Sequence, residues 1–205
     1  MFRDRKDAGQ KLASELEAKY PKIKNGVVLA LPRGGVVIGS EVAKALNLPL
    51  DIIVTRKIGA PLNPEYAIAA VSEHEMIVSP RENPDLNYVN KEAEKERREI
   101  QRRAKEYRGQ KPKIDLKNQT VILVDDGLAT GLTMEVALRE VRQKNPRQII
   151  LAVPVAPPET VENFKRIVDD IIVLNIEPLF FAVGQFYEDF VAVSDKQVKE
   201  YLRDF

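Results

Sequence analysis

The chain has 205 residues, enough for one α/β domain that buries roughly 70% of the surface exposed by its unfolded form. Its 32 basic and 31 acidic residues leave a net charge of +1, so no overall field favours nucleic acid as a partner. The sequence has no cysteine and one histidine, His74. Disulfides, thiolate nucleophiles, cysteine-ligated zinc and histidine clusters are therefore excluded.

The start of the sequence and its apolar runs bear on localisation. Residues 1–7 lack the apolar core of a secretory signal, and no run approaches the 18 apolar residues of a membrane-spanning helix. We expect a cytoplasmic protein with no membrane partner.

Segments with helical spacing alternate with short buried strands along the chain. Strands are expected at 27–31, 51–55, 121–124, 148–153 and 171–174, and helices at 4–20, 36–46, 91–111, 134–144 and 158–167. A turn-rich segment, 59–90, is expected to hold a hairpin of strands 67–72 and 76–79, and residues 154–158 a rigid proline loop. The pattern predicts an α/β fold with a doubly wound, mostly parallel five-stranded central sheet flanked by helices.

One strand-loop-helix unit organises the rest of the sequence. The apolar residues 121–124 are followed by Asp125-Asp126-Gly127-Leu128-Ala129-Thr130-Gly131-Leu132-Thr133 and then by a helix. Loop amides, threonine hydroxyls and a helix N-terminus together favour a phosphate. Two carboxylates beside a phosphate site make chemical sense if the ligand also carries sugar hydroxyls that donate to them.

This segment resembles the 5-phosphoribosyl-1-pyrophosphate (PRPP) motif of type I phosphoribosyltransferases. The resemblance implies that Asp125 and Asp126 meet the ribose hydroxyls, and these acids are also the candidate metal ligands. It further implies that the loop holds the 5-phosphate through five residues: Gly127, Ala129, Thr130, Gly131 and Thr133.

A second strand-loop-helix unit follows the strand at 27–31. Its loop, Pro32-Arg33-Gly34-Gly35, combines a fixed positive charge with two glycines that let amides approach an anion. Leu-Pro-Arg-Gly-Gly is similar to the pyrophosphate loop of phosphoribosyltransferases, which often contains a non-proline cis peptide. The alternative is a tight turn that leads into a helix.

Two adjacent cations, Arg56 and Lys57, follow the second predicted strand. Arg-Lys-x-Gly resembles the pair that meets pyrophosphate in adenine phosphoribosyltransferases, which implies a catalytic role for Lys57 beside Arg33, Asp125 and Asp126. Solvated charges at a strand end are the alternative for Arg56.

Two residues of the turn-rich segment could act as catalytic groups. By resemblance Glu65 is a candidate acid, although Pro-Glu-Tyr also fits the start of a strand or helix. His74 lies between two glutamates in an expected turn, and we expect it to be a surface residue rather than part of a triad.

The predicted helix at 91–111 is highly charged, with more basic than acidic residues. RNA binding is one interpretation. A solvated face with pairs such as Glu94–Arg98 and Glu99–Arg103 is the favoured one. Its narrow apolar stripe would pack on the main domain or on a second subunit.

The tail gathers aromatic residues between 180 and 190. Stacking surfaces and backbone amides suit a planar base, so Phe181, Val183 and Phe186 are candidate base-binding residues. The segment faintly resembles the base-holding region of hypoxanthine-guanine phosphoribosyltransferases, with Asp189 displaced by one residue. A C-terminal strand that caps the core is the alternative.

Together the motifs predict a single domain, 1–205, with an insertion at 59–111 and a C-terminal hood at 175–205. The family implies transfer of the phosphoribosyl group of PRPP with Mg²⁺ to a nitrogen acceptor by a homodimer, and a nucleobase of nucleotide metabolism is the expected acceptor. The rivals are a non-catalytic PRPP-sensing or nucleotide-sensing regulator that binds RNA and, with less support, a sugar-phosphate hydrolase.

Overall fold

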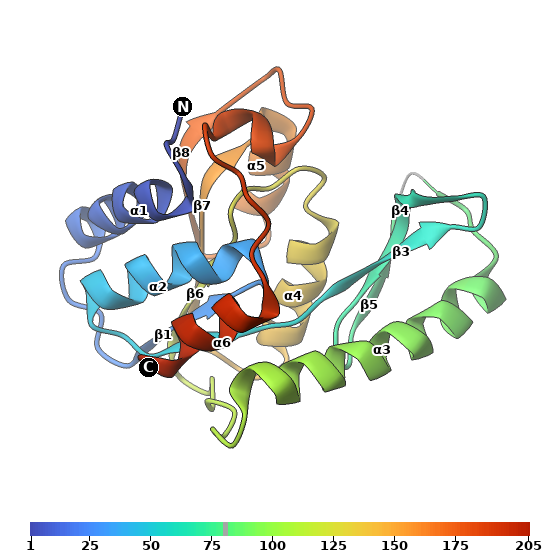
Figure 1. The fold of residues 1–205 in the computed structure, drawn as a ribbon, viewed down its shortest axis with the longest axis horizontal. Coiled ribbons are helices and arrows are strands. Elements are labelled where there is room, and N and C mark those ends of the chain that lie inside the picture. Colours follow the sequence, from blue (N-terminus) through green and yellow to red (C-terminus); the bar gives the residue numbers. More distant parts are fainter. Residues whose placement is uncertain (80–81) are drawn as a thin grey trace.

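The computed structural model describes residues 1–79 and 82–205, and a parallel sheet forms its centre (Figure 1). The strands of this sheet are β1 (Gly26–Ala30), β2 (Leu50–Ile52), β6 (Thr120–Val124), β7 (Gln148–Ala156) and β8 (Asp170–Ile176). They lie in the order β2-β1-β6-β7-β8, and every neighbouring pair is parallel. The predicted five-stranded α/β architecture is confirmed.

Helices cover both faces of this sheet. They are α1 (Arg5–Lys19) and α2 (Gly34–Leu46) on one face, and α4 (Leu132–Arg142) and α5 (Pro158–Lys165) on the other. In β1 all residues are buried, and Val28 packs in the cluster of α1 and α2 whereas Val27 packs in that of α4 and α5. This explains why the strands are continuously apolar instead of alternating.

The strand order reverses between β1 and β6. From β1 the chain passes through α2 to β2 on one side, and from β6 it passes through α4 to β7 on the other. Open α/β sheets bind ligands at the carboxyl ends of strands at such a switch point. The loops that follow β1 and β6 are the two loops with the strongest phosphate signatures in the sequence.

A smaller antiparallel sheet extends away from the central sheet along the helix α3 (Leu86–Arg108) (Figure 1). It consists of β3 (Arg56–Ala60), β4 (Asn63–Val71) and β5 (Met76–Val78), in the order β3-β4-β5. The expected hairpin is β4 and β5. The strand β3 was not predicted, and the cations Arg56 and Lys57 begin it instead of lying in a loop.

The apolar stripe of α3 packs inside this chain. Val89, Ala93, Ile100 and Tyr107 are buried in the same cluster as the core of α1 and α2. Tyr107 donates a hydrogen bond of 2.6 Å to Asp195 of α6 (Asp195–Arg203).

Acidic residues of α3 compensate much of the basic charge of this helix. Glu99 pairs with Arg103 at 2.6 Å, as expected, and also with Arg102 at 2.7 Å. No ion pair joins Glu94 and Arg98 among residues 1–79 and 82–205. This pairing favours the solvated-face interpretation over an RNA-binding face.

The proline segment after Val153 differs from prediction. Residues 154–156 continue β7, whereas a rigid loop was expected over 154–158. Pairing with β6 ends at Ala152, and pairing with β8 resumes at Val155. Beyond Ala152, β7 has no paired strand on the side of β6. Pro154, which lacks an amide donor, is tolerated there because no inter-strand hydrogen bond is lost.

The C-terminal segment is mostly irregular between β8 and α6. It contains a short 3₁₀ helix, η1 (Val183–Phe186), and its single strand contact is a parallel bridge of Tyr187 with Phe2. The alternative of a C-terminal strand is therefore wrong, and α6 was not predicted. In the described part of the chain, no helix has the length and apolar character needed to cross a membrane.

Candidate functional site

The two loops at the switch point interlock. A methyl group on Gly35 would lie 2.9 Å from Cα of Asp125, and one on Gly34 would lie 1.9 Å from Oδ2 of Asp126. Leu31 donates a backbone hydrogen bond of 3.0 Å to Val124 just before both loops begin. The two predicted loops thus form one site, and glycine is required where they touch.

Several donors of these loops point to no protein acceptor. Within residues 1–79 and 82–205, the amides of Ala129, Thr130 and Gly131 make no hydrogen bond to the protein, nor do the hydroxyls of Thr130 and Thr133. The same holds for the amides of Gly34 and Gly35 at the start of α2. Unpaired amides at two helix N-termini form an environment that favours anions.

The loop after β6 is held rigidly from below. The Leu128 amide donates to the Val155 carbonyl at 2.9 Å, and Thr160 Oγ1 donates to the Ala129 carbonyl at 2.8 Å. Gly131 has φ of +77°, a conformation that side chains rarely adopt, and it lies against Phe164. These contacts engage the Leu128 amide and the Ala129 carbonyl, and they leave the amides of residues 129–131 available to a ligand.

The two carboxylates of the site lie side by side and differ in their partners. Asp125 Oδ1 accepts the Asp126 amide at 2.8 Å, and burial together with the negative charge of Asp126 raises the pKa of Asp125 well above its ordinary value. Burial also raises the pKa of Asp126, but the Arg5 guanidinium opposes this rise. Both groups are well placed to accept hydrogen bonds from hydroxyls.

Two residues that contact Asp126 were not predicted. Arg5 donates from Nε to Oδ2 of Asp126 at 2.7 Å, and the Tyr187 hydroxyl donates to the Asp126 carbonyl at 2.6 Å. Ala8 and Leu12 lie on the buried face of α1, and Arg5 occupies the position about one turn before Ala8 on the same face. A charged residue at the start of a buried stripe was the available signal. Tyr187 carried none beyond its place in the aromatic tail.

Arg33 lies at the start of α2. The Pro32–Arg33 peptide is cis, as the resemblance predicts. The Arg33 side chain is 44% exposed, and its Nη1 lies 3.6 Å from Asp195 Oδ1. This long, exposed contact leaves the guanidinium free to turn toward an anion at the loop.

The cations Arg56 and Lys57 have different surroundings. Arg56 donates from Nε to Glu96 of α3 at 2.7 Å, so its charge is compensated. Lys57 is exposed, and its ammonium has no ion pair in the described part of the chain. The structure therefore separates the two, with Lys57 available to a ligand and Arg56 engaged with α3.

The candidate base-binding residues of the tail also differ in their surroundings. Val183 covers Gly127, where a methyl group would lie 2.7 Å from it, and the Phe186 ring packs on Phe180 with centroids 4.9 Å apart. Phe181 is 88% exposed, and its amide donates to Gln185 Oε1 at 2.8 Å. Val183 is therefore next to the loop after β6, and Phe181 extends into solvent.

The remaining acidic candidates, Glu65 and Asp189, are both exposed. Glu65 lies in β4, which agrees with the strand alternative for Pro-Glu-Tyr. The Asp189 amide donates to the Arg3 carbonyl at 2.8 Å, and its carboxylate accepts the Val191 amide at 3.1 Å. These contacts assign Asp189 to the structure of the hood.

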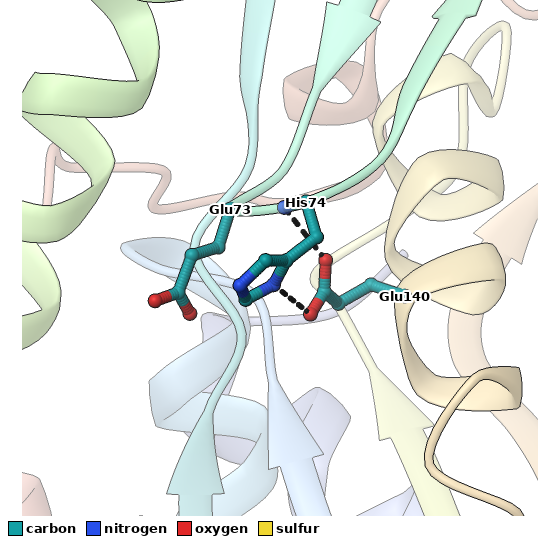
Figure 2. A group of neighbouring side chains, drawn as sticks. All are labelled: Glu73, His74 and Glu140. Atoms are coloured by element: carbon teal, nitrogen blue, oxygen red, sulfur yellow. Dashed lines mark hydrogen bonds and ion pairs between the residues drawn. The ribbon is translucent and has the colours of Figure 1, made fainter.

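A separate group, Glu73, His74 and Glu140, joins the β4–β5 turn to α4 (Figure 2). The His74 ring lies between the two carboxylates, with Nδ1 2.8 Å from Glu140 Oε1. Glu73 pairs with Lys113 at 2.9 Å, and Lys144 lies 3.6 Å from Glu140. Lysines thus neutralise both carboxylates. We call Glu73, His74 and Glu140 the pin, because their contacts hold the small sheet against α4. The His74 side chain is 59% exposed, as predicted.

This pin borders a cavity of about 280 Å³ between α3, α4 and the end of β2. Its walls are mostly apolar, with Ile53, Ile100 and Val141 among them. None of its lining residues belongs to the loops after β1 and β6. The cavity is therefore distinct from the candidate anion site at the two loops.

Known proteins resemble this chain over its whole length. The family model described as the phosphoribosyl transferase domain matches residues 3–190. A Mycobacterium tuberculosis (strain H37Rv) protein, Rv0571c, provisionally named a phosphoribosyl transferase, is 39% identical over 214 residues, which cover 100% of this chain and 48% of that protein. The chain thus spans about half the length of the curated relatives that it matches.

Solved structures agree. The crystal structure of TT1426 from Thermus thermophilus is 44% identical with a TM-score of 0.83, covering 100% of this chain and 98% of that one. The AQ2163 protein from Aquifex aeolicus shares the fold at 17% identity, with a TM-score of 0.53 and coverage of 97% and 85%. With the family model matching most of its length, this chain belongs to the phosphoribosyl transferase domain family.

Proposed function

We propose that the protein transfers the 5-phosphoribosyl group of PRPP to a nitrogen acceptor, a nucleobase by preference, and releases pyrophosphate. This proposal rests on a set of amides that have no partner among residues 1–79 and 82–205 and that flank two adjacent carboxylates: Ala129, Thr130, Gly131, Gly34 and Gly35. A ligand with phosphates at both ends and hydroxyls between them satisfies both loops at once.

Each part of the site has one task in this reaction. The amides and hydroxyls of 129–133 bind the 5-phosphate, and Asp125 and Asp126 accept hydrogen bonds from the ribose hydroxyls. The C1–O bond to pyrophosphate breaks and a C1–N bond forms, and the proton of the acceptor nitrogen passes to the released pyrophosphate. The two carboxylates stabilise the positive charge that develops near C1.

The leaving pyrophosphate needs positive charge. Arg33 and Lys57 can supply it together with the amides of Gly34 and Gly35, whereas Arg56 would first have to leave Glu96. The carboxylate oxygens of Asp125 and Asp126 suit Mg²⁺, directly or through its waters, and the ion when bound would neutralise pyrophosphate. Positioning and electrostatics then account for catalysis without a covalent intermediate.

The acceptor is proposed to bind beneath the hood. Val183 lies against Gly127, next to the proposed sugar site, and Phe181 offers an exposed ring that can stack on a base. The aromatic character of this segment favours a planar acceptor over a simple amine.

Pyrophosphate release tests the transfer. PRPP and Mg²⁺ would be incubated with purines, pyrimidines, orotate and simple amines, using the native chain and the double variant Asp125→Asn with Asp126→Asn. Release that depends on one acceptor and is lost in the double variant supports the proposal. PRPP binding without release for any acceptor, combined with salt-dependent RNA binding, would contradict it and favour a PRPP-sensing regulator.

A further inference from the structure

Arg5 is the one cation that contacts a carboxylate of the site in the described part of the chain, and it comes from outside the motifs. Its Nε lies 2.7 Å from Asp126 Oδ2, and the two side chains are only 11% and 14% exposed. A methyl group on Gly34 would lie 2.8 Å from the same Nε. Arg5 therefore sits where the loops after β1 and β6 meet.

The guanidinium is fixed on three sides. Besides its bond to Asp126, Arg5 donates from Nη1 to the Val191 carbonyl at 2.7 Å, and its central carbon lies 3.7 Å from the centroid of the Phe190 ring. The planar guanidinium is held by a carboxylate, a carbonyl and an aromatic face. It therefore loses little further conformational entropy when a ligand binds.

Arg5 fixes the carboxylate of Asp126 through one of its two oxygens, because Nε donates to Oδ2 at 2.7 Å. The Tyr187 hydroxyl meanwhile holds the Asp126 carbonyl at 2.6 Å. The side chain and backbone of Asp126 are thus both anchored, and Arg5 fixes the direction in which the carboxylate points.

The segment that carries Arg5 is also joined to the hood. The Glu188 amide donates to the Phe2 carbonyl at 2.9 Å, and the Asp189 amide donates to the Arg3 carbonyl at 2.8 Å. These bonds extend the parallel bridge between Phe2 and Tyr187. Arg5 therefore connects the hood, through Val191 and Phe190, to the carboxylate that faces the sugar.

We propose that Arg5 is a positioning residue. It orients the Asp126 carboxylate toward the sugar hydroxyls of the ligand, and it fixes the position of this carboxylate relative to the hood. The proposal rests on the proposed function, because it assumes that the ligand is a sugar phosphate. It predicts that Arg5 affects ligands with hydroxyls and leaves ligands that consist of phosphate alone unaffected.

The test compares PRPP with inorganic pyrophosphate, each with Mg²⁺, by calorimetry. Arg5→Gln should weaken PRPP binding by about ten-fold or more, the effect of one misplaced charge-assisted hydrogen bond, and change pyrophosphate binding by less than about two-fold. Arg3→Gln is the matched control, because Arg3 is 74% exposed and pairs with Asp7. It should bind both ligands like the native chain.

Two further variants separate positioning from folding. Arg5→Lys keeps the charge beside Asp126 but lacks the planar fork, so its PRPP affinity should lie between those of the native chain and Arg5→Gln. In an Asp126→Asn background, Arg5→Gln should cause no additional loss, because its effect passes through Asp126.

Equal losses for PRPP and pyrophosphate in Arg5→Gln or Arg5→Lys would overturn the proposal, because a merely structural role weakens both ligands. Additive losses with Asp126→Asn would also overturn it. A native chain that binds neither PRPP nor pyrophosphate would instead refute the proposed function, which keeps the two failures distinct.

Discussion

Gly34, the first residue of α2, and Asp126, in the loop after β6, lie far apart in the sequence, yet a methyl group on Gly34 would lie 1.9 Å from Oδ2 of Asp126. The contact makes one site of the loops after β1 and β6. It also links that site to Arg5, because the same oxygen accepts the Arg5 hydrogen bond at 2.7 Å.

Gly34→Ala is expected to weaken PRPP binding while the protein stays folded. The new methyl group would force the Asp126 carboxylate to rotate away from Arg5, which disrupts the acceptor for the ribose hydroxyls. Calorimetry with PRPP and Mg²⁺ measures the loss, which should be about ten-fold or more.

Gly109→Ala provides the control for this substitution. Gly109 ends α3 with φ of +61° and ψ of −119°, and its methyl group would meet nothing within 4 Å. The variant should lose about 1–3 kcal/mol in free energy of unfolding through backbone strain and keep native PRPP affinity. Native affinity in Gly34→Ala would disprove the interlocking of the loops.

Lys57→Gln should weaken ligands that carry pyrophosphate. Lys57 is exposed and has no ion pair in the described part of the chain, so its charge is available to the leaving group. We expect PRPP and pyrophosphate to bind about ten-fold more weakly, and ribose 5-phosphate to bind as in the native chain. Competition binding with the three ligands measures this pattern.

The matched control is Lys24→Gln, an exposed lysine that precedes β1 at the end opposite the loop at 32–35. Its affinities should all be native. A loss of ribose 5-phosphate affinity in Lys57→Gln equal to the loss of PRPP affinity would place Lys57 outside the pyrophosphate site.

His74→Ala should destabilise the protein by about 1–3 kcal/mol near neutral pH, because the buried Glu140 carboxylate loses a hydrogen bond. Burial acts to raise the pKa of Glu140, but hydrogen bonds from His74 and Ser72 lower it below its ordinary value. A carboxylate with a lowered pKa stabilises the fold above its unfolded pKa, and this contribution is lost as the pH falls through the folded pKa.

Urea unfolding of the native chain and of His74→Ala, at pH 7 and at pH 3, tests the direction of this pH dependence. The difference in free energy of unfolding between the two proteins should shrink at pH 3, because this pH lies below the ordinary pKa of a glutamate, 4.5, toward the lowered pKa of Glu140. Glu75→Gln, a charge change in the same turn, should alter the free energy of unfolding by less than about 0.5 kcal/mol. An equal difference at both pH values would show that the pin does not depend on ionised Glu140.

The sequence predicted those parts of the fold that follow from local patterns. Continuous apolar strands indicated a parallel sheet, and the structure confirms it, with loops after 27–31 and 121–124 as expected. Phosphate binding by these loops stays a prediction. The strand order itself brings the two loops together, because parallel strands present their carboxyl ends at one edge.

Other features depend on tertiary contacts that a local pattern does not contain. Arg5 reaches Asp126 across 121 residues of sequence, and only packing of α1 against the sheet brings them together. The strand β3 begins with Arg56 and Lys57, whose polarity concealed it. The helix α6, by contrast, was missed although local signals for it exist: Ser194 and Gln197 form a capping box, and Val198, Tyr201 and Leu202 follow helical spacing.

Titration of the protein with PRPP and Mg²⁺ by calorimetry tests the central claim most directly. The native chain should bind PRPP below millimolar concentration, and the folded double variant Asp125→Asn with Asp126→Asn should bind it about a hundred-fold more weakly, since two charge-assisted acceptors are lost. No binding to the native chain at millimolar PRPP, or equal binding to both proteins, would contradict the claim that these two carboxylates hold the ribose of a phosphoribosyl donor.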